Sequence, residues 1–407
     1  KNREGAGCLA ILDDYESFHV QKWQRSASNN KIDHKLPLRH VGRGIMGQRG
    51  SNAYRVPSDK NIAENWRMMR RYFDALPDVM RELTPLAKRV ARKNTIVVMT
   101  CNFGQSALLV NFACTAKRRG FDLGHVLVFA TDTETYDLAK ALGLEAFHDN
   151  RLFDKLPKKE AHMYMDPIFA AMMYAKVLCV QLINFLGYDL VFQDVDIVWY
   201  RDPIEVFHNS SSPYSRFDMV FQDDGAHTPR YAPYSANSGF YYVKYNARTR
   251  YLFTALLYQG EMILEKKSHQ QALTALLDEH SSLFGLKVKT IPLDDNDFPG
   301  GWHYHSRKKV NFMKEIAKGS IVPRLFHMSW TSNKDNKLLF MRQMGMWHLK
   351  DKCVNLKVAD VKIDEGEDFS STCCSKEPII TCHYRDKPSI IPCKDSPPID
   401  KGKKSFW

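Results

Sequence analysis

The chain has 407 residues, which is enough for one large domain with extensions or for two domains. Hydrophobic residues make up 44% and charged residues 26%, as in an ordinary globular protein with a sizeable core. No run of 18 apolar residues occurs, which excludes a transmembrane helix on sequence grounds. The formal net charge is +12, and residues 1–93 hold 19 Lys/Arg against 10 Asp/Glu. This basic segment suits a membrane, an anionic polymer or an acidic acceptor, or is simply solvated surface.

Residues 1–93 are predicted to form an N-terminal extension that is partly helical. The glycine-rich segment 42–52 is expected to be a loop. Residues 61–93 carry apolar side chains at helical spacing, with Pro77 and Pro85 as interruptions. The basic clusters here fit helix faces better than a phosphate-binding stripe, so no nucleic-acid partner is expected.

An alternation of strands and helices begins near residue 94. The predicted elements are strands at 95–102, 125–132 and 188–194, with helices at 104–120, 133–143 and 165–187 between them. Further strands at 217–224 and 238–246 and helices at 248–262 and 268–280 follow. This order predicts a Rossmann-like α/β fold, with a parallel sheet covered on both faces.

Ligands of such sheets bind outside the carboxyl ends of the strands. Asp194 and Asp196 lie at one of these ends and flank a single residue. Residues i and i+2 of an extended chain face the same side, so both carboxylates can reach one point. Two such anions repel unless a cation joins them, and oxygen ligands suit Mg²⁺ or Mn²⁺. The pair is therefore interpreted as a metal site, with two acids on a surface turn as the alternative.

Haloacid-dehalogenase-like phosphatases use a similar DxDx[TV] pattern, and residues 194–198 fit it. There the first aspartate is a nucleophile. That motif normally opens its domain, whereas here two strand–helix units precede it. No G-x-G-x-x-G or Walker loop occurs in the chain.

The cysteines fall into an early and a late group. Cys101, Cys114 and Cys179 lie in apolar stretches and are expected to be plain core thiols. The late group comprises Cys353, Cys373, Cys374, Cys382 and Cys393. Their segment is poor in core-forming residues, so we expect at least one disulfide within it and an oxidising compartment. A zinc site is the alternative, although the segment has no CxxC pair.

Several segments together resemble the nucleotide-diphospho-sugar transferase family. This is a GT-A-fold group of retaining glycosyltransferases that includes plant arabinosyl- and xylosyltransferases and a protist galactosyltransferase. The resemblance covers roughly residues 94–350, which would form the GT-A domain, with residues 351–407 as a Cys-rich tail. The segments that carry it are VVMTCNFG (97–104), GYDLVFQDVDIVWYRDP (187–203), ANSGFYYVK (236–244), HQQALTALL (269–277), FPGGWHY (298–304) and RLFHMSW (324–330).

The resemblance implies a role for each matching residue. Asp194, Asp196 and His327 would hold the metal, and Lys337 would neutralise the β-phosphate. The other residues implied at the donor are Thr100, Asn102 and Gly104 at the uridine, Lys176 at the nucleotide sugar, and Asn237 and Gln270 at the sugar. Asp223 is the preferred additional acid for sugar or acceptor contact. Acids in a polar loop are the plain alternative for Asp223.

The chain departs from the family pattern at two places. His269 stands where the family usually has Asp before Gln, which leaves the donor sugar open. Met328 and Ser329 stand where an Asn often follows the histidine. Retention needs no second carboxylate if the leaving phosphate accepts the acceptor's proton. Inversion would need a base, for which the candidates are Asp223, Asp224, Asp295 and Asp297.

The sequence thus predicts a GT-A fold with a mixed central sheet flanked by helices, a helical N-terminal extension and a Cys-rich C-terminal segment. The expected function is metal-dependent retaining transfer of a sugar from a UDP-sugar to a glycan or glycoprotein acceptor, with Mn²⁺ or Mg²⁺. The alternatives are a phosphatase and a non-catalytic carbohydrate-binding protein, which His269 keeps open. The sequon at Asn209 fits a secretory route. We expect the Golgi lumen, with a type II membrane anchor ahead of Lys1.

Overall fold

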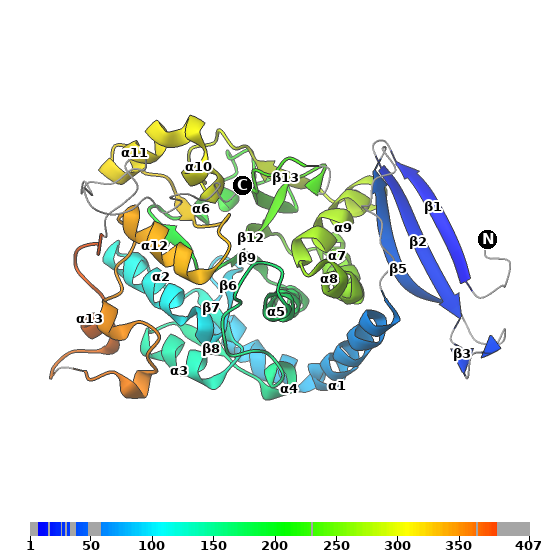
Figure 1. Ribbon diagram of the computed structural model, residues 1–407, viewed down its shortest axis with the longest axis horizontal. Helices are drawn as coiled ribbons and strands as arrows, with labels where there is room; N and C mark the ends of the chain where they lie inside the picture. The colour runs from blue at the N-terminus through cyan, green and yellow to red at the C-terminus, as the bar shows by residue number, and fades with distance from the viewer. Residues whose placement is uncertain are drawn as a thin grey trace.

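The computed structural model describes residues 58–228, 231–363 and 365–380 in full, and strands between residues 7 and 47. The N-terminal strands are β1 (Gly7–Asp14), β2 (Ser17–Arg25), β3 (Ala27–Ser28), β4 (Lys31–Ile32) and β5 (Leu38–Gly47). β1, β2 and β5 form an antiparallel sheet that lies to one side of the main body (Figure 1). The loop expected at 42–52 is therefore wrong for residues 42–47, which pair with β2 as part of β5.

A seven-stranded mixed sheet forms the centre of the molecule, in the order β13-β11-β12-β9-β6-β7-β8. Its strands are β6 (Thr95–Cys101), β7 (Val126–Ala130), β8 (Glu145–Phe147), β9 (Asp189–Gln193), β11 (Met219–Asp223), β12 (Ala236–Val243) and β13 (Val288–Ile291). β12 is antiparallel to both of its neighbours, and the other pairs are parallel. The expected mixed sheet with flanking helices is confirmed.

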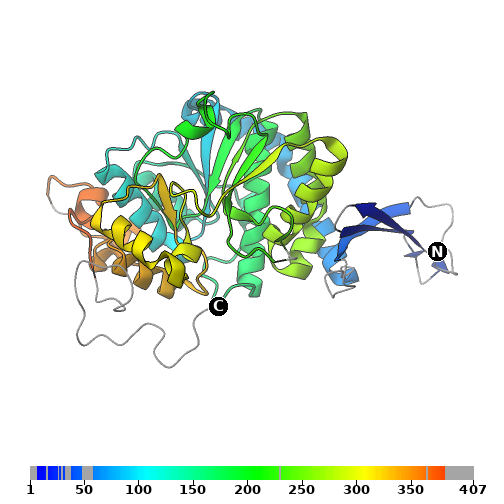
Figure 2. The same ribbon diagram turned by 90° about the horizontal axis from the view of Figure 1, so that it is seen from above.

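Alternate side chains of each strand enter different hydrophobic clusters. In β6, Ile96 and Val98 pack on one face of the sheet, and Val97 and Met99 pack on the other. The first face is covered by α1 (Asp59–Val90), α4 (Asn150–Phe153), α5 (Pro167–Phe185), α7 (Ala247–Tyr258), α8 (Gly260–Lys266) and α9 (His269–Phe284). The second is covered by α2 (Ser106–Arg118), α3 (Thr133–Ala141), α6 (Glu205–His208), α10 (Gly301–His305), α11 (Val310–Lys318), α12 (Lys334–Gln343) and α13 (Phe369–Cys373). Figure 2 shows the strands between these two layers.

Helix α1 begins at the N-cap Ser58, whose hydroxyl accepts a hydrogen bond from the backbone N–H of Asn61 at 3.2 Å. It runs without a break through Pro77 and Pro85. The expectation that these prolines interrupt the helix is therefore wrong. Burial of Val79 and Leu83 against the sheet outweighs the loss of backbone hydrogen bonds at the prolines.

Helix α5 fills the middle of the first layer. Asp166 caps it by accepting from the N–H of Phe169 at 2.7 Å, and Pro167 occupies its first turn. Among the described helices, α5 is long and apolar enough to cross a membrane by length and composition. However, 72% of its apolar window is buried inside the molecule. It lies beside β6 and β9 in the centre of Figure 1, as the core helix of this layer.

Of the two disulfides among the described residues, one lies within the C-terminal segment and the other attaches it to the domain. Cys353 pairs with Cys373, which confirms a disulfide within the late group. Cys114 pairs with Cys374 across 260 residues of sequence, so the expectation that Cys114 is a plain core thiol is wrong. Its apolar helix gave no sign of a partner so distant in sequence. Cys101 and Cys179 are buried and free, as expected, while Cys382 and Cys393 lie outside the described residues.

Candidate active site

The two acids lie where β9 ends, and a short strand pair brings the histidine to them. The N–H of Asp194 donates to the carbonyl of Gly239 at 2.8 Å, which anchors the chain just after β9. β10 (Ile197–Trp199) then runs antiparallel to β14 (Leu325–His327), with Ile197 opposite His327. One ligand atom from each of Asp194, Asp196 and His327 lies within 4.8 Å of the others. The predicted ligand set therefore meets at one point.

Each acid of the pair faces a lysine. Lys176 Nζ of α5 lies 2.5 Å from Asp194 Oδ1, and Lys337 Nζ of α12 lies 2.6 Å from Asp196 Oδ2. Burial alone would raise the pKa of Asp196, but Lys337 and His327 outweigh it and hold that pKa below its ordinary value. Burial would lower the pKa of Lys337, yet Asp196 and Asp194 raise it. Asp196 is thus anionic and the Lys337 ammonium is charged at neutral pH.

The remaining oxygen of Asp196 suits an additional ligand. Asp196 is 1% exposed, and its Oδ1 is buried without a hydrogen-bond partner among the described residues. His327 Nε2 lies 3.4 Å from that oxygen. Gly239 lets these groups approach, because a Cβ there would lie 2.8 Å from Asp194 Oδ2 and 2.5 Å from His327 Cε1. Any side chain at position 239 would displace the cluster.

A second cluster, which we call the amide cluster, consists of Asp224 with the amides of Asn237 and Gln270. It adjoins the first at Gly239, because a Cβ there would also lie 3.0 Å from Asn237 Oδ1. Asn237 Nδ2 donates to Asp224 Oδ1 at 2.8 Å, and Asn237 Oδ1 accepts from the N–H of Gly239 at 2.7 Å. Gln270 Oε1 accepts from the N–H and the hydroxyl of Ser238 at 3.1 and 3.0 Å. Burial raises the pKa of Asp224 to about 6, although hydrogen bonds from Gln270 and Asn237 act in the opposite direction. The structure thus brings Asn237 and Gln270 together around one carboxylate.

The other acids considered from the sequence have structural partners. Asp223 lies beside His227 Nε2 at 3.0 Å and accepts from the N–H of Gly225 at 2.7 Å. Asp295 accepts from the hydroxyl of Tyr214 at 2.6 Å. Asp297 forms ion pairs with Arg201 and Arg324. Of these acids, Asp224 is the one bonded to Asn237 and Gln270.

The three residues expected at the uridine lie at the end of β6. Thr100 and Asn102 are buried, at 6% and 1% exposure. Asn102 Nδ2 donates to the carbonyls of Pro157 and Lys159 at 2.8 and 2.9 Å. Gly104 donates its N–H to the carbonyl of Lys158 at 2.8 Å, and a Cβ on it would meet Glu160. The segment 157–160 therefore occupies polar groups of Asn102 and Gly104, which the family resemblance places at the nucleotide.

His269 begins α9 and is buried. Its Nδ1 lies 3.0 Å from Met173 Sδ of α5, and it is 2% exposed. Burial and the charge of Lys176 lower the pKa of this imidazole well below its ordinary value. His269 is therefore a neutral side chain of α9 that contacts α5. It stands at the position where the resemblance leads us to expect an acid.

Three contacts of the site could not be predicted from the sequence. Gln222 accepts a hydrogen bond from His327, the Ser238 hydroxyl donates to Gln270, and the Trp330 indole N–H donates to the backbone carbonyl of Asp224. Gln222 and Ser238 lie in strands that look like ordinary sheet. They were missed because their partners come from elements far away in the chain.

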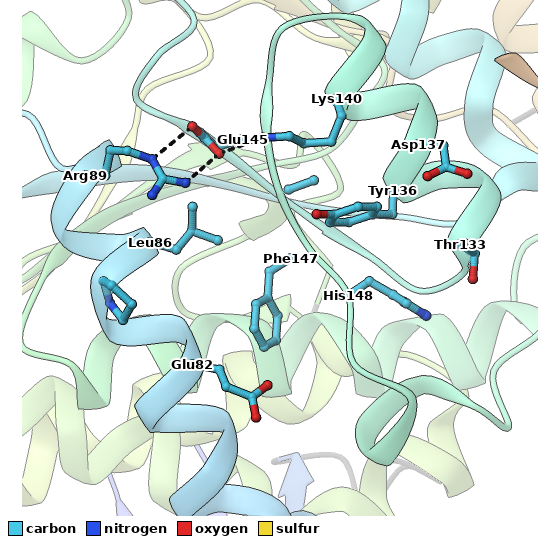
Figure 3. Close-up of a pocket in the computed structure, with 12 residues that line it drawn as sticks. Glu82, Leu86, Arg89, Thr133, Tyr136, Asp137, Lys140, Glu145, Phe147 and His148 are labelled. Carbon is cyan, nitrogen blue, oxygen red and sulfur yellow. Dashed lines mark hydrogen bonds and ion pairs between the residues drawn. The ribbon is translucent and has the colours of Figure 1, made fainter.

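A cavity of about 540 Å³ lies elsewhere, at the edge of the sheet. It is lined by residues of α1, α3 and the segment 145–148. Figure 3 shows Arg89 and Lys140 both pointing to Glu145 at its rim, at 3.0 Å each. None of the residues that line it belongs to the acid pair or the amide cluster, so it is separate from the candidate active site.

Comparisons with known proteins agree on one family. The chain is 23% identical over 303 residues to the UDP-galactose:fucoside alpha-3-galactosyltransferase of Dictyostelium discoideum, which covers 65% of this chain and 45% of that protein. It is 24% identical over 277 residues to the beta-arabinofuranosyltransferase RAY1 of Arabidopsis thaliana, covering 65% and 50%. It is 23% identical over 307 residues to the Arabidopsis UDP-D-xylose:L-fucose alpha-1,3-D-xylosyltransferase 3, covering 71% and 76%.

The chain spans about half the length of the first two of these relatives. The model of the family described as nucleotide-diphospho-sugar transferase matches residues 122–341, which is more than half of the chain. The matched range includes the acid pair, the amide cluster and both lysines. The chain therefore belongs to the nucleotide-diphospho-sugar transferase family.

Proposed function

We propose that this protein is a metal-dependent retaining glycosyltransferase, which moves a sugar from a UDP-sugar to a hydroxyl of a glycan or glycoprotein acceptor. The observation that carries the proposal is the cluster of Asp194, Asp196 and His327. Carboxylate and imidazole ligands suit Mn²⁺ or Mg²⁺, and the unpartnered buried oxygen of Asp196 fits such an ion. A bound ion of this kind would neutralise charge on the departing diphosphate.

The lysines supply the chain's own positive charge at the same place. Lys176 and Lys337 now donate to the two aspartates. When a diphosphate arrives, both ammonium groups would donate to phosphate oxygens, where charge develops as the sugar leaves. Thr100, Asn102 and Gly104 would bind the uridine once the segment 157–160 has withdrawn from Asn102 and Gly104.

The transfer step is proposed to occur on one face of the sugar. The bond between the anomeric carbon and the diphosphate oxygen breaks, and the acceptor oxygen bonds to the same face. The acceptor's proton passes to an oxygen of the leaving phosphate. Gln270 is a neutral amide, so its proposed role is to orient the sugar with Asn237. Asp295 and Asp297, which could have served as bases for inversion, are engaged by Tyr214 and by two arginines.

The test is a panel of UDP-sugars incubated with Mn²⁺ and without acceptor. Slow release of UDP from one donor is expected, and Asp196→Asn should abolish it while the protein stays folded. Asp360→Asn, an exposed acid far along the chain, serves as the control and should keep full activity. Wild-type turnover by Asp196→Asn, or in excess chelator, would contradict the metal assignment. With an acceptor and an α-linked UDP-sugar, early product should show an α-linked anomeric proton signal by NMR; a β-linked product from that donor would contradict retention.

We also propose that the protein works in the Golgi lumen. The two disulfides support an oxidising compartment. Asn209 of the sequon is exposed, as a glycosylated asparagine must be.

A further inference from the structure

Gln222 lies directly behind the histidine of the acid–histidine cluster. It belongs to β11 and is 2% exposed. Its Oε1 lies 2.8 Å from His327 Nδ1. Its Nε2 donates to the carbonyls of Phe298 and Pro299 at 2.9 and 3.1 Å. All the polar atoms of this buried amide therefore have partners: the oxygen faces a ring nitrogen, and the nitrogen donates to two carbonyl oxygens.

The two carbonyls fix which way the amide points. A flipped Gln222 would place its oxygen against two acceptors and its N–H groups against the imidazole, and neither carbonyl would then receive a hydrogen bond from it. The turn that supplies these carbonyls stands close behind the amide, since a Cβ on Gly300 would lie 3.2 Å from Gln222 Nε2. The oxygen of Gln222 is consequently held toward His327.

An oxygen at Nδ1 decides where the proton of the imidazole resides. Gln222 Oε1 can only accept, so Nδ1 must carry a hydrogen. In the neutral ring the lone pair is then on Nε2, the atom that faces Asp196 Oδ1 at 3.4 Å. His327 is 2% exposed, and β14 fixes its backbone against β10. The contacts with Gln222 and β10 therefore fix the orientation of the ring and place a hydrogen on Nδ1 before any ligand arrives.

We propose that Gln222 is a positioning residue of the metal site, which presents Nε2 of His327 to a divalent cation shared with Asp194 and Asp196. The proposal rests on the metal site named under the proposed function. Hydrogen-bond partners behind a metal-bound histidine fix its orientation and raise its basicity as a ligand. Gln222 does so with a neutral amide, which adds no charge behind a site that already holds two acids and two lysines.

The test measures Mn²⁺ binding directly, without nucleotide or acceptor, by titration with detection of free Mn²⁺ by electron paramagnetic resonance. Gln222→Met removes the acceptor at similar volume and should raise the Kd for Mn²⁺ by about 10- to 100-fold. Gln222→Glu keeps an acceptor at Nδ1 and should retain more of the affinity. The matched control is Gln343→Met, because Gln343 is also 2% exposed and accepts a buried hydrogen bond, from Tyr304 at 2.7 Å. It should lower the melting temperature and leave the Kd unchanged.

The outcomes separate this role from the proposed function. Unchanged Kd in Gln222→Met, or an equal loss in Gln343→Met, would overturn the positioning role while the metal site stands. Failure of the wild type to bind Mn²⁺ would overturn the metal site and this role together. A second measurement needs no variant at position 222. Long-range ¹H–¹⁵N NMR of histidine-labelled wild type, with His327 assigned by its loss in His327→Ala, should show Nδ1 protonated; a ring protonated at Nε2 alone would contradict the proposal.

Discussion

Charge at the acid pair is balanced residue for residue. Lys176 faces Asp194 and Lys337 faces Asp196, on side chains from α5 and α12. An unpaired buried carboxylate is costly, so these contacts stabilise the site when no ligand is bound. In the proposed mechanism the same contacts are exchanged for phosphate oxygens during turnover. Resting stability and donor binding would then depend on the same two ammonium groups.

Asp224 should destabilise the folded protein at neutral pH. Burial raises its pKa in the folded state to about 6 from an ordinary value of 3.8, so folding favours the protonated form. The loss of folding stability caused by ionising this buried carboxyl is absent below about pH 4 and reaches its full size above about pH 6. Asp224→Asn should therefore be more stable than wild type at pH 7.5, by about 2 kcal/mol once partial exposure is allowed for, and by less at pH 5.

Urea unfolding at the two pH values checks this prediction. Asp360→Asn is the control, since Asp360 is exposed and its replacement should change stability little at either pH. A stability difference between wild type and Asp224→Asn that is the same at pH 5 and pH 7.5 would contradict the buried-acid interpretation.

Helix α1 behaves as part of the transferase core, although the sequence suggested a boundary at residue 93. Val79 and Leu83 are fully buried, in the same hydrophobic cluster as Val98 and Phe129 of the sheet. The assignment of residues 1–93 to a separate extension remains a prediction. The packing favours a transferase domain that includes α1.

Leu83→Ala tests this view of α1. Deletion of a fully buried leucine should lower the free energy of unfolding by about 2–5 kcal/mol, in one cooperative transition. Leu283→Ala, at a residue 57% exposed on α9, should change it by less than about 0.5 kcal/mol. Thermal or urea melting followed by circular dichroism distinguishes them. A separate early transition for α1, or no loss in Leu83→Ala, would show that the helix is an independent extension.

The sequence was sufficient for the elements whose pattern is local. The run from Thr95 to Cys101 is β-branched and apolar, and it forms a strand buried on both faces. The acid pair was recognisable because its spacing and its place after a strand are both short-range features. The predicted interruptions at Pro77 and Pro85 were wrong because the packing that stabilises α1 comes from the sheet, which is distant in sequence. Tertiary burial overrides helix propensity here.

Long-range partners were the part that sequence could not supply. Nothing near Cys114 points to Cys374, and nothing near Gln222 points to His327, because these contacts exist only after the chain has folded. The sequence could not distinguish Asp223 from Asp224 for the same reason, and the preference for Asp223 remains a prediction. Neighbouring acids look alike in sequence, but one pairs with His227 and the other bonds to Asn237.

At the scale of the whole molecule, the two disulfides close loops of very different length. Cys114–Cys374 spans 260 residues, and Cys353–Cys373 spans 20. A cross-link restricts the unfolded chain more strongly when its loop is longer. We therefore expect Cys114→Ser/Cys374→Ser to lower the free energy of unfolding by about 3–5 kcal/mol, and Cys353→Ser/Cys373→Ser to lower it by about 2–3 kcal/mol. The variant that lacks the bond closing the longer loop should show the larger loss.

Melting of the two double variants checks the order, and non-reducing peptide mapping of the wild type checks the pairing. Both variants remove two sulfur atoms, so each controls for the chemistry of the other. A larger loss for the short loop would show that local strain or packing, and not chain restriction, governs these bonds. Free thiols at all four positions in protein from an oxidising host would contradict the pairing itself.

The pairing of Ile197 with His327 also sets an order of assembly. Every strand of the seven-stranded sheet, and both aspartates, lie in the chain up to Ile291. The histidine arrives later and joins them only when β14 docks on β10. A nascent or truncated chain that ends before Leu325 thus contains every strand of the seven-stranded sheet but lacks His327, so the three-residue cluster appears only in chains whose C-terminal portion has docked.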